Sequence, residues 1–234
     1  YIQTILDKFK IPYTHSGAIA SSIAMDKEIS KKLFIKNKIK TPKFFTYSYD
    51  ITKSNLIKKI NKNLRFPVVI KPLNEGSSVN VYISSKKTLD KILYKLKVYK
   101  KVLIEEFIGG REIQVAIMGD KKLGAIELKP KRKFYDYQAK YDSKSKTQHI
   151  IPVDLPKSKF NKVMDIAYKA HKIIGCRGVT RSDFKFFNGN FYLLELNTQP
   201  GMTKLSLVPE IALYRGISFL KLIEWMLKDA SKKK

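Results

Sequence analysis

Four polar side chains in residues 178–202 have the types and spacing of a metal and phosphate site. They are Arg181, Asp183, Glu195 and Asn197, and they interrupt otherwise apolar runs. Because side chains alternate along a strand, the first two share one strand face, as do the last two. Carboxylate and amide oxygens suit a Mg²⁺ ion that also holds nucleotide phosphates. The simpler alternative is an ordinary hairpin in which Arg181 neutralises Asp183 or Glu195, since a buried carboxylate needs a positive partner.

The loop length of this hairpin sets which residues face one another. A two-residue loop at Asn188-Gly189 would place Asp183 opposite Leu194 and would mix polar and apolar side chains on both faces. A three-residue loop, residues 188–190, places Asp183 opposite Glu195 instead. Because register follows the buried face, we expect the three-residue loop. The two-residue loop would leave the two carboxylates facing opposite ways.

The three-residue loop also separates the hairpin into a polar and an apolar face. It pairs Arg181 with Asn197 and places Gly189 or Asn190 at positive φ. The expected apolar face consists of Phe184, Phe186, Tyr192, Leu194 and Leu196. The sequence therefore predicts a polar platform on one side of the hairpin.

Two lysines elsewhere in the chain are candidates for binding phosphate. Lys71 ends a buried apolar strand, and the Gly76-Ser77-Ser78 turn beyond it can wrap a phosphate with backbone N–H groups. Lys27 lies in the first turn of a helix that Asp26 can cap. A lysine there opposes the helix dipole, so it is either an anion contact or a solvated surface residue.

Apolar periodicity predicts the helices and strands that must position these residues. The expected helices are residues 1–10, 26–37, 54–61, 86–99 (capped by Ser84 or Ser85), 158–174, 205–214 and 218–230. The expected strands are residues 66–72, 79–83, 102–108, 111–118 and 123–128, together with the two strands of the hairpin. Residues 131–147 show no clean period, and a long irregular loop of this kind usually serves function.

Length and composition are those of a globular protein. The chain has 234 residues, 44% of them hydrophobic, which is enough for one large domain or two modest ones. It has no run of 18 apolar residues, so we expect no membrane span. The single Cys176 excludes an internal disulfide and indicates a reducing compartment. No histidine forms a recognisable pair with this thiol, and we expect it to be structural.

The net charge of +27 raises nucleic acid as a partner. Only six of the 47 basic residues are arginines, however, and the lysines are spread along the chain. Proteins that read phosphates and bases rely on arginine forks, so a lysine-rich genome composition explains the charge better. A basic nucleic-acid-binding module stays open as the non-enzymatic alternative.

Eight segments of the chain recur in the same order in one enzyme family. They are IPYTHSG, AMDK, FPVVIKPLNEGSSV, VLIEEFIGGRE, FYDYQAKY, GCRGVTRSDF, YLLELNTQPGM and SLVP. The chain therefore resembles the D-alanine–D-alanine ligases of the ATP-grasp superfamily. The resemblance implies an α+β ATP-grasp fold in which two subdomains clasp ATP. Residues 16–108 would be the central subdomain with the lid, and residues 109–234 the C-terminal subdomain with the metal and substrate site.

The resemblance also implies that residues 1–15 are the remnant of an N-terminal domain that is otherwise missing. In the family that domain helps to hold the first D-alanine. We therefore expect this chain to bind ATP and Mg²⁺ but to ligate poorly.

Individual roles follow from the resemblance, residue by residue. The ATP site would comprise Lys27, Lys71, Gly76, Ser77, Ser78, Glu105, Glu106, Phe107, Ile108, Glu112 and Lys140. Within it, residues 105–108 would meet the adenine, Glu112 would meet the ribose hydroxyls, and residues 76–78 would form the lid over the phosphates. The catalytic residues would be Arg181, Gly201, Ser77, Tyr141 and Lys140, and the substrate contacts Arg181, Gly201 and Ser206. Asp183, Glu195 and Asn197 would bind two Mg²⁺ ions, for which Mn²⁺ can substitute.

The implied reaction makes D-alanyl-D-alanine for peptidoglycan precursors, with ATP as co-substrate. ATP phosphorylates the first D-alanine, and the amine of the second displaces phosphate from the acyl phosphate. Both steps build negative charge on oxygen, so metals, Lys and Arg lower the barrier. Residues 131–147 would close over the acyl phosphate and keep water out.

The resemblance further implies a cytoplasmic protein with no nucleic-acid or membrane partner, commonly a homodimer. Other ATP-grasp ligases, such as a D-alanine–D-lactate or D-alanine–D-serine enzyme, are the nearest alternative. Lys140-Tyr141 in AKY resembles the dipeptide-forming members and favours D-alanine as the second substrate.

Overall fold

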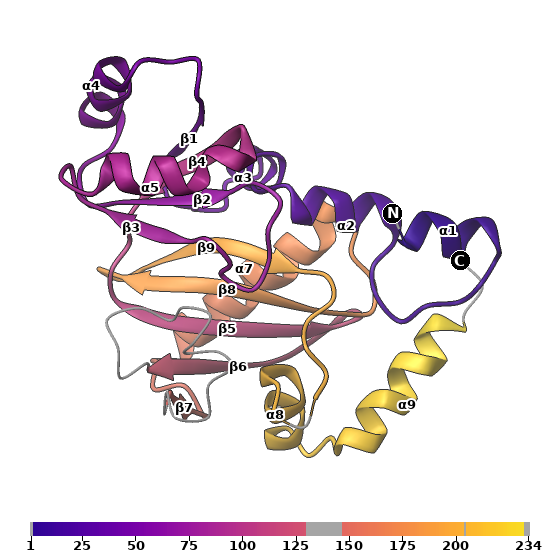
Figure 1. Ribbon diagram of the computed structural model, residues 1–234. Helices are drawn as coiled ribbons and strands as arrows, with labels where there is room; N and C mark the ends of the chain where they lie inside the picture. Colours follow the sequence, from indigo (N-terminus) through magenta and orange to yellow (C-terminus); the bar gives the residue numbers. More distant parts are fainter. Residues whose placement is uncertain (1, 130–146, 204, 232–234) are drawn as a thin grey trace.

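Two antiparallel sheets with helices packed against them form the expected α+β fold. The computed structural model describes residues 2–129, 147–203 and 205–231. The sheets lie one above the other (Figure 1). No helix in these ranges is both long enough and apolar enough to cross a membrane.

The smaller sheet has four strands in the order β1-β4-β2-β3. These strands are β1 (Phe44–Ser48), β2 (Val68–Pro72), β3 (Tyr82–Ser84) and β4 (Lys101–Glu106). Helices α4 (Lys53–Asn63) and α5 (Leu89–Leu96) cover one face, where Val68 and Ile104 are fully buried. Because strands alternate, Lys71 on β2 and Glu105 on β4 point to the opposite face.

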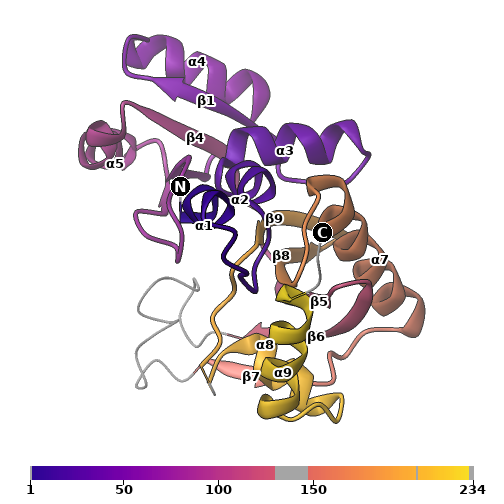
Figure 2. The same ribbon diagram turned by 90° about the vertical axis from the view of Figure 1, so that its right-hand side faces the viewer.

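The larger sheet has five strands in the order β7-β6-β5-β8-β9. These strands are β5 (Arg111–Met118), β6 (Lys121–Lys129), β7 (Gln148–Ile150), β8 (Val179–Phe187) and β9 (Asn190–Asn197). One face packs against α7 (Lys157–Ile174). On the other face, α8 (Leu207–Tyr214) and α9 (Phe219–Ala230) cover one end only (Figure 2). The uncovered end of that face carries the polar residues of the hairpin.

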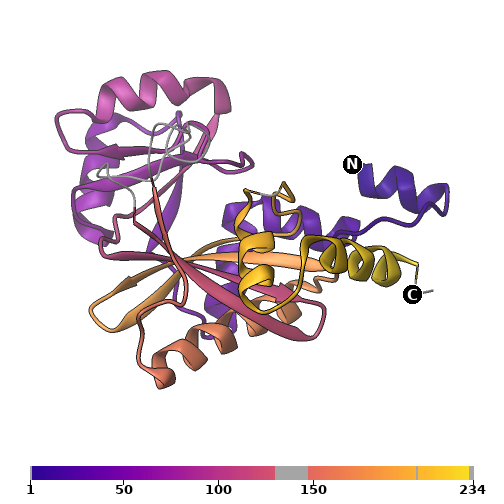
Figure 3. The ribbon, with the colours of Figure 1, turned by 90° about the horizontal axis from the view of Figure 1, so that it is seen from below.

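Three helices precede the first strand. Helix α1 (Ile2–Lys8) lies at the edge of the molecule, on the side from which α9 also projects (Figure 3). Helices α2 (Ala18–Met25) and α3 (Lys27–Lys36) share the core of α7 and the larger sheet through Ala20, Ala24 and Phe34. The first part of residues 16–108 thus packs on the larger sheet, while the subdomain boundaries themselves stay a prediction.

The hairpin closes differently from the expected three-residue loop. Phe187 pairs with Asn190, so the loop has two residues, and Asn188 and Gly189 both have positive φ (47° and 73°). This is the geometry of a primed turn, which matches the twist of the flanking strands. The expected three-residue loop is therefore wrong, and Asn190 belongs to the strand.

A β-bulge restores the pairing that the two-residue loop would have destroyed. The register shifts by one between Asp183 and Phe184, so Asp183 lies opposite Glu195 and Phe184 opposite Leu193. The extra residue on β9 is Leu194, and bulges of this kind are common beside active sites. We assumed that a two-residue loop would keep one register along both strands and so separate the two carboxylates. That assumption is wrong, because the register shifts at the bulge.

The bulge also changes the membership of the apolar face. Phe191 and Leu193 are buried there in place of the expected Tyr192 and Leu194, and the rings of Phe191 and Phe186 stack with centroids 4.5 Å apart. Leu196 is buried as expected. The sequence pattern located the polar face correctly beyond the bulge and misplaced the apolar residues between the bulge and the turn.

Other differences concern short elements. Strands β1 and β7 were not expected, because each is short and lies at the edge of its sheet. Helix α5 begins after Thr88, which replaces Ser84 or Ser85 at the N-cap, and a 3₁₀ turn (Lys97–Tyr99) follows it. The cap of α3 is confirmed, since Asp26 accepts hydrogen bonds from the backbone of Glu28 and Ile29. Residues 130–146, most of the irregular segment, lie outside the described ranges.

Candidate functional site

A cleft between the two sheets gathers most of the predicted ATP-site residues. Including the solvent in its open mouth, it contains about 730 Å³ of space that no atom fills. We call it the inter-sheet cleft. Its lining comprises Lys27, Val69, Lys71, Glu75, Ser78, Val81, Glu105, Glu106, Phe107, Ile108, Glu112, Asp183, Lys185, Leu194 and Glu195.

Lys27 is buried at the floor of the inter-sheet cleft, so the alternative of a solvated surface lysine is wrong. Only 5% of it is exposed, and its Nζ donates to the backbone carbonyls of Leu73 and Glu75. Burial lowers the pKa of Lys27, and the Glu195 carboxylate opposes that shift. The helix therefore presents a cation to the loop that leads into the predicted Gly76-Ser77-Ser78 lid.

Lys71 shares one carboxylate with a second lysine. Glu105 is almost fully buried between Lys71 and Lys31, and its Oε2 lies 2.9 Å from Lys31 Nζ. Burial alone would raise the pKa of Glu105, but the two lysines lower it below its ordinary value. The Glu105 side chain thus binds the lysines, and its predicted contact with adenine stays a prediction.

Glu112 lines the inter-sheet cleft from the larger sheet. Its Oε2 accepts a hydrogen bond from Lys185 Nζ at 3.0 Å, and its Oε1 accepts one from Gln114 Nε2 at 3.2 Å. The expectation that Glu112 shares a strand face with Gln114 is confirmed. These contacts fix the carboxylate at the cleft wall, and its predicted contact with ribose hydroxyls stays a prediction.

The polar platform of the hairpin has features of both interpretations of the sequence, the ion pair and the metal site. Arg181 donates two hydrogen bonds to Asp183, at 2.7 and 3.0 Å, so the ion pair of the simpler alternative exists. Asp183 and Glu195 nevertheless pair directly across β8 and β9 and both line the inter-sheet cleft. Asn197 lies opposite Arg181 on the same face, as expected.

The donor set of this platform fits a hard divalent cation. Within the described ranges, no three His, Cys, Asp or Glu side chains converge as a metal site, so an ion here would need the Asn197 amide besides the two carboxylates. The Asn197 Nδ2 atom is buried without a hydrogen-bond partner in the described part of the chain. Because Nδ2 is a donor, it suits a hydrogen-bond acceptor such as a phosphate oxygen, whereas a metal ion would bind the Oδ1 atom of Asn197.

Three cavities adjoin one another along the platform. A second cavity shares Lys27, Glu75 and Glu195 with the inter-sheet cleft and is also lined by Asn197. A third shares Thr198 and Gln199 with the second and reaches Gly201. Glu195 thus lines both the cleft and the second cavity, which in turn adjoins the cavity that Gly201 lines.

The predicted lid has an unusual backbone. Ser77 and Ser78 both have positive φ (52° and 59°), whereas Gly76 does not. Residues other than glycine rarely adopt this conformation, and it concentrates at ligand-binding loops. Ser78 lines the inter-sheet cleft and Gly76 and Ser77 line the second cavity.

Gly201 and Ser206 lie together, as the substrate prediction requires. A Cβ atom on Gly201 would stand 2.9 Å from Ser206 Oγ. Ser206 Oγ also accepts a hydrogen bond from the backbone N–H of Thr203 at 3.0 Å. The predicted residues Lys140 and Tyr141 lie outside the described residues.

Two charged residues of this region, Lys31 and Lys185, were not predicted. Lys31 follows Lys27 by one helical turn, so the i, i+4 spacing placed it on the same face. Lys185 follows Asp183 by two residues on β8, so strand alternation placed it beside Glu112. Both signals exist in the sequence, but neither distinguishes a buried lysine from the many exposed ones. Cys176 is half-buried, and burial raises the pKa of its thiol to about 11, as suits a structural residue.

The comparisons with known proteins agree with this geometry. Residues 33–228 match the family described as D-ala D-ala ligase C-terminus. A curated D-alanine–D-alanine ligase of Pelagibacter ubique (strain HTCC1062) is 71% identical over 231 residues, covering 99% of this chain and 76% of the relative.

Two solved structures share the fold. The D-alanine–D-alanine ligase of Bacillus anthracis complexed with ATP has a TM-score of 0.83 at 29% identity, covering 98% of this chain and 73% of that one. The VanG D-Ala:D-Ser ligase of Enterococcus faecalis has a TM-score of 0.86 at 26% identity, covering 98% and 68%. The chain therefore belongs to the D-alanine–D-alanine ligase family and has its ATP-grasp fold.

Proposed function

We propose that this chain ligates two D-alanines with ATP through an acyl phosphate, in the synthesis of peptidoglycan precursors. The observation that carries the proposal is the row of three cavities, in which Lys27 and Glu195 line both the inter-sheet cleft and the second cavity. A nucleotide in the cleft would present its terminal phosphate at that boundary. A carboxylate in the second cavity would then meet it.

Charge in the inter-sheet cleft supports phosphate binding. Lys27 and Lys71 are both buried and both line the cleft. Electrostatic contacts are strong where water is excluded, and phosphoryl transfer depends mainly on positioning and charge. The two lysines would bind the phosphates, Glu105 to Ile108 would meet the adenine, and Glu112 would meet the ribose.

Asp183, Glu195 and Asn197 would hold Mg²⁺, which supplies neutralising charge to the phosphates when bound. Arg181 at present occupies both oxygens of Asp183. Arg181 would exchange part of this ion pair for the oxyanion that forms as the amine attacks, together with the Gly201 N–H group. Ser206 would hold the carboxylate of the second D-alanine.

The domain boundaries, the cytoplasmic location and a homodimer belong to the same proposal. A cytoplasmic location follows from ATP as co-substrate. Lys140 and Tyr141 would belong to the segment that closes over the acyl phosphate. The alternative concerns the second substrate, which would be D-serine if this chain acted like the VanG D-Ala:D-Ser ligase.

Nucleotide binding and turnover test the proposal in two steps. We expect calorimetry to detect ATP binding in the presence of Mg²⁺, and phosphate release to depend on D-alanine. Mass spectrometry of the product, with D-serine and D-lactate supplied in competition, identifies the second substrate. Absence of ATP binding together with salt-sensitive DNA binding would instead favour the basic nucleic-acid-binding module.

A further inference from the structure

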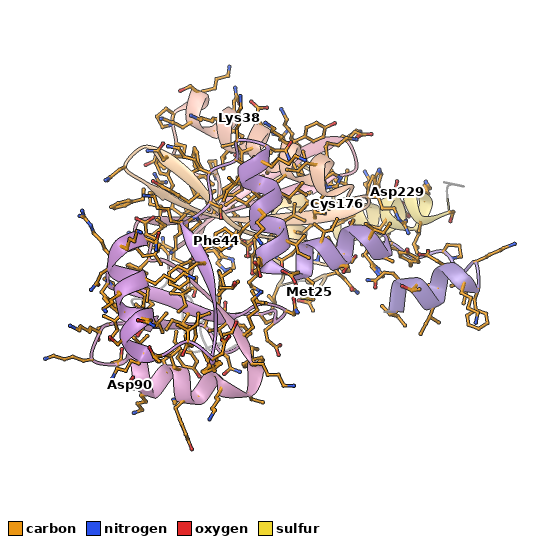
Figure 4. The ribbon with its side chains drawn as sticks, turned by 90° about the horizontal axis from the view of Figure 1, so that it is seen from above. Met25, Lys38, Phe44, Asp90, Cys176 and Asp229 are labelled. Atoms are coloured by element: carbon orange, nitrogen blue, oxygen red, sulfur yellow. The ribbon has the colours of Figure 1, made fainter. Side chains whose placement is uncertain are left out.

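Lys31 is a charged residue in a fully buried position. It belongs to α3, and its Nζ lies over the ring of Phe44 on β1, which Figure 4 labels. Its side chain has no exposed surface and is not among the residues that line the inter-sheet cleft. Its Nζ lies 2.9 Å from Glu105 Oε2, donates to Thr41 Oγ1 at 2.6 Å, and stands 5.6 Å from the centre of the Phe44 ring.

Stability alone does not account for a lysine at this position. Removing an ammonium group from water is costly, and replacing buried ion pairs by apolar residues of similar volume is often neutral or stabilising. Replacing the whole cluster by apolar residues would avoid that cost, whereas replacing Lys31 alone would leave the buried Glu105 paired with Lys71 and no longer with Lys31. The charge of Lys31 therefore calls for a role in addition to packing.

The charges around Glu105 indicate that role. Glu105 carries one negative charge and binds both Lys31 and Lys71. Together the three side chains carry one net positive charge at the wall of the cleft. Without Lys31, the remaining pair of Glu105 and Lys71 would be neutral and would attract a phosphate only weakly.

We propose that Lys31 is a positioning residue for the nucleotide: it neutralises Glu105, so that the charge of Lys71 remains available to the phosphates of ATP. The inference rests on the proposed ATP site and deepens it. Lys31 acts through Glu105 and Lys71 and does not itself touch the nucleotide.

The protonation of Lys31 fits this arrangement. Burial lowers its pKa to about 8, although Glu105 raises it in part, while Lys71 lowers it further and Glu195 raises it slightly. Those are the charged groups that face Lys31. Loss of its proton would remove the positive charge that the cluster contributes to the cleft.

Direct measurement of Mg·ATP binding tests the role. We expect Lys31→Met to weaken binding roughly tenfold, the effect of losing one charge-assisted contact, and Lys31→Arg to restore most of the loss. The control is Lys32→Met, because Lys32 is exposed on the same helix and pairs only with Glu28 at 2.7 Å in the described structure. Lys32→Met should bind within about twofold of the wild type.

A double-mutant cycle separates positioning from folding. In a Glu105→Gln background, Lys31→Met should weaken Mg·ATP little further, because no carboxylate remains to be neutralised and the charge of Lys71 is already available. Equal losses in both backgrounds, or a lower Tm with unchanged ATP affinity, would overturn the inference.

The wild-type chain supplies a test that requires no methionine variant to fold. Its affinity for Mg·ATP should fall as the pH rises from about 7 to about 9.5, while Lys31→Arg, which stays charged, should fall much less. The same pH profile in both proteins would contradict the proposal. If the wild type binds no Mg·ATP at any pH, the proposed function itself fails and this inference fails with it; failure of the inference alone leaves wild-type binding intact.

Discussion

Asp183 and Glu195 lie directly opposite each other across β8 and β9, although the hairpin that joins these strands closes with only two residues. The bulge at Leu194 makes both features compatible. It shifts the register once, between the turn and the platform, and thereby places both carboxylates at the wall of the inter-sheet cleft.

The juxtaposition predicts that the charge of Glu195 governs magnesium-dependent binding. Glu195→Gln preserves the size of a half-buried side chain and removes one of the two carboxylates. We expect ATP affinity in Mg²⁺ to fall at least roughly tenfold, with little change in Tm. Calorimetry with and without Mg²⁺ measures the effect, and Glu224→Gln on the exposed face of α9 is the matched control. Unchanged affinity in Mg²⁺ would mean that the metal assignment is wrong.

Loss of Lys71 should lower the ATP affinity more than the loss of one positive charge elsewhere on the chain. Lys71→Ala removes a buried cation from the cleft wall, and we expect ATP affinity to fall roughly tenfold or more. Lys91→Ala changes the net charge equally at an exposed position of α5. Titrations of both variants at low and high salt separate a site from bulk attraction. Equal losses in the two variants would indicate bulk charge.

Binding of the second D-alanine should require the space that Gly201 leaves beside Ser206. A methyl group at this position would stand 2.9 Å from Ser206 Oγ, which can rotate away at small cost to stability. We expect Gly201→Ala to leave the free energy of unfolding within about 1 kcal/mol of the wild type, and to raise the KM for the second D-alanine roughly tenfold.

Gly17→Ala is the control for Gly201→Ala, because its added Cβ would meet only ordinary contacts. Steady-state kinetics with D-alanine varied distinguish the two variants. An unaltered KM in Gly201→Ala would remove Ser206 from the substrate site.

Stability should depend on alkaline pH through Lys31. Burial lowers its pKa from 10.5 to about 8, so between these values the unfolded chain binds more protons than the folded one. The contribution of Lys31 to the free energy of unfolding therefore rises with pH across that window, by at most about 1.4 kcal/mol per pH unit. This contribution is fully present above the unfolded pKa of 10.5 and is lost as the pH falls through the folded pKa of about 8.

Urea unfolding of the wild type and Lys31→Met from pH 7.5 to 10.5 measures this dependence. The difference between the two proteins should shift in favour of the wild type as the pH rises. A constant difference would show that Lys31 has the same pKa in the folded and unfolded chains.

Much of the fold could be read from local pattern. Helical periodicity and the Asp26 cap located α3, and alternation placed Arg181 on one face with Asp183, and Glu195 on one face with Asn197. These features depend on neighbours within a few residues, so the sequence by itself determines them. The resemblance to the ligases then named the residues that the cleft brings together.

Tertiary structure decided what local pattern could not express. The bulge at Leu194 depends on twist and packing across two strands, and the edge strand β1 exists because β4 offers it a partner. Nothing local distinguishes Lys27 and Lys31 from the exposed lysines around them. Their burial depends on Glu105 and on the carbonyls of the loop after β2, which long-range packing brings to α3. An ionised side chain can remain buried only where distant residues satisfy it, and only the folded chain shows where they are.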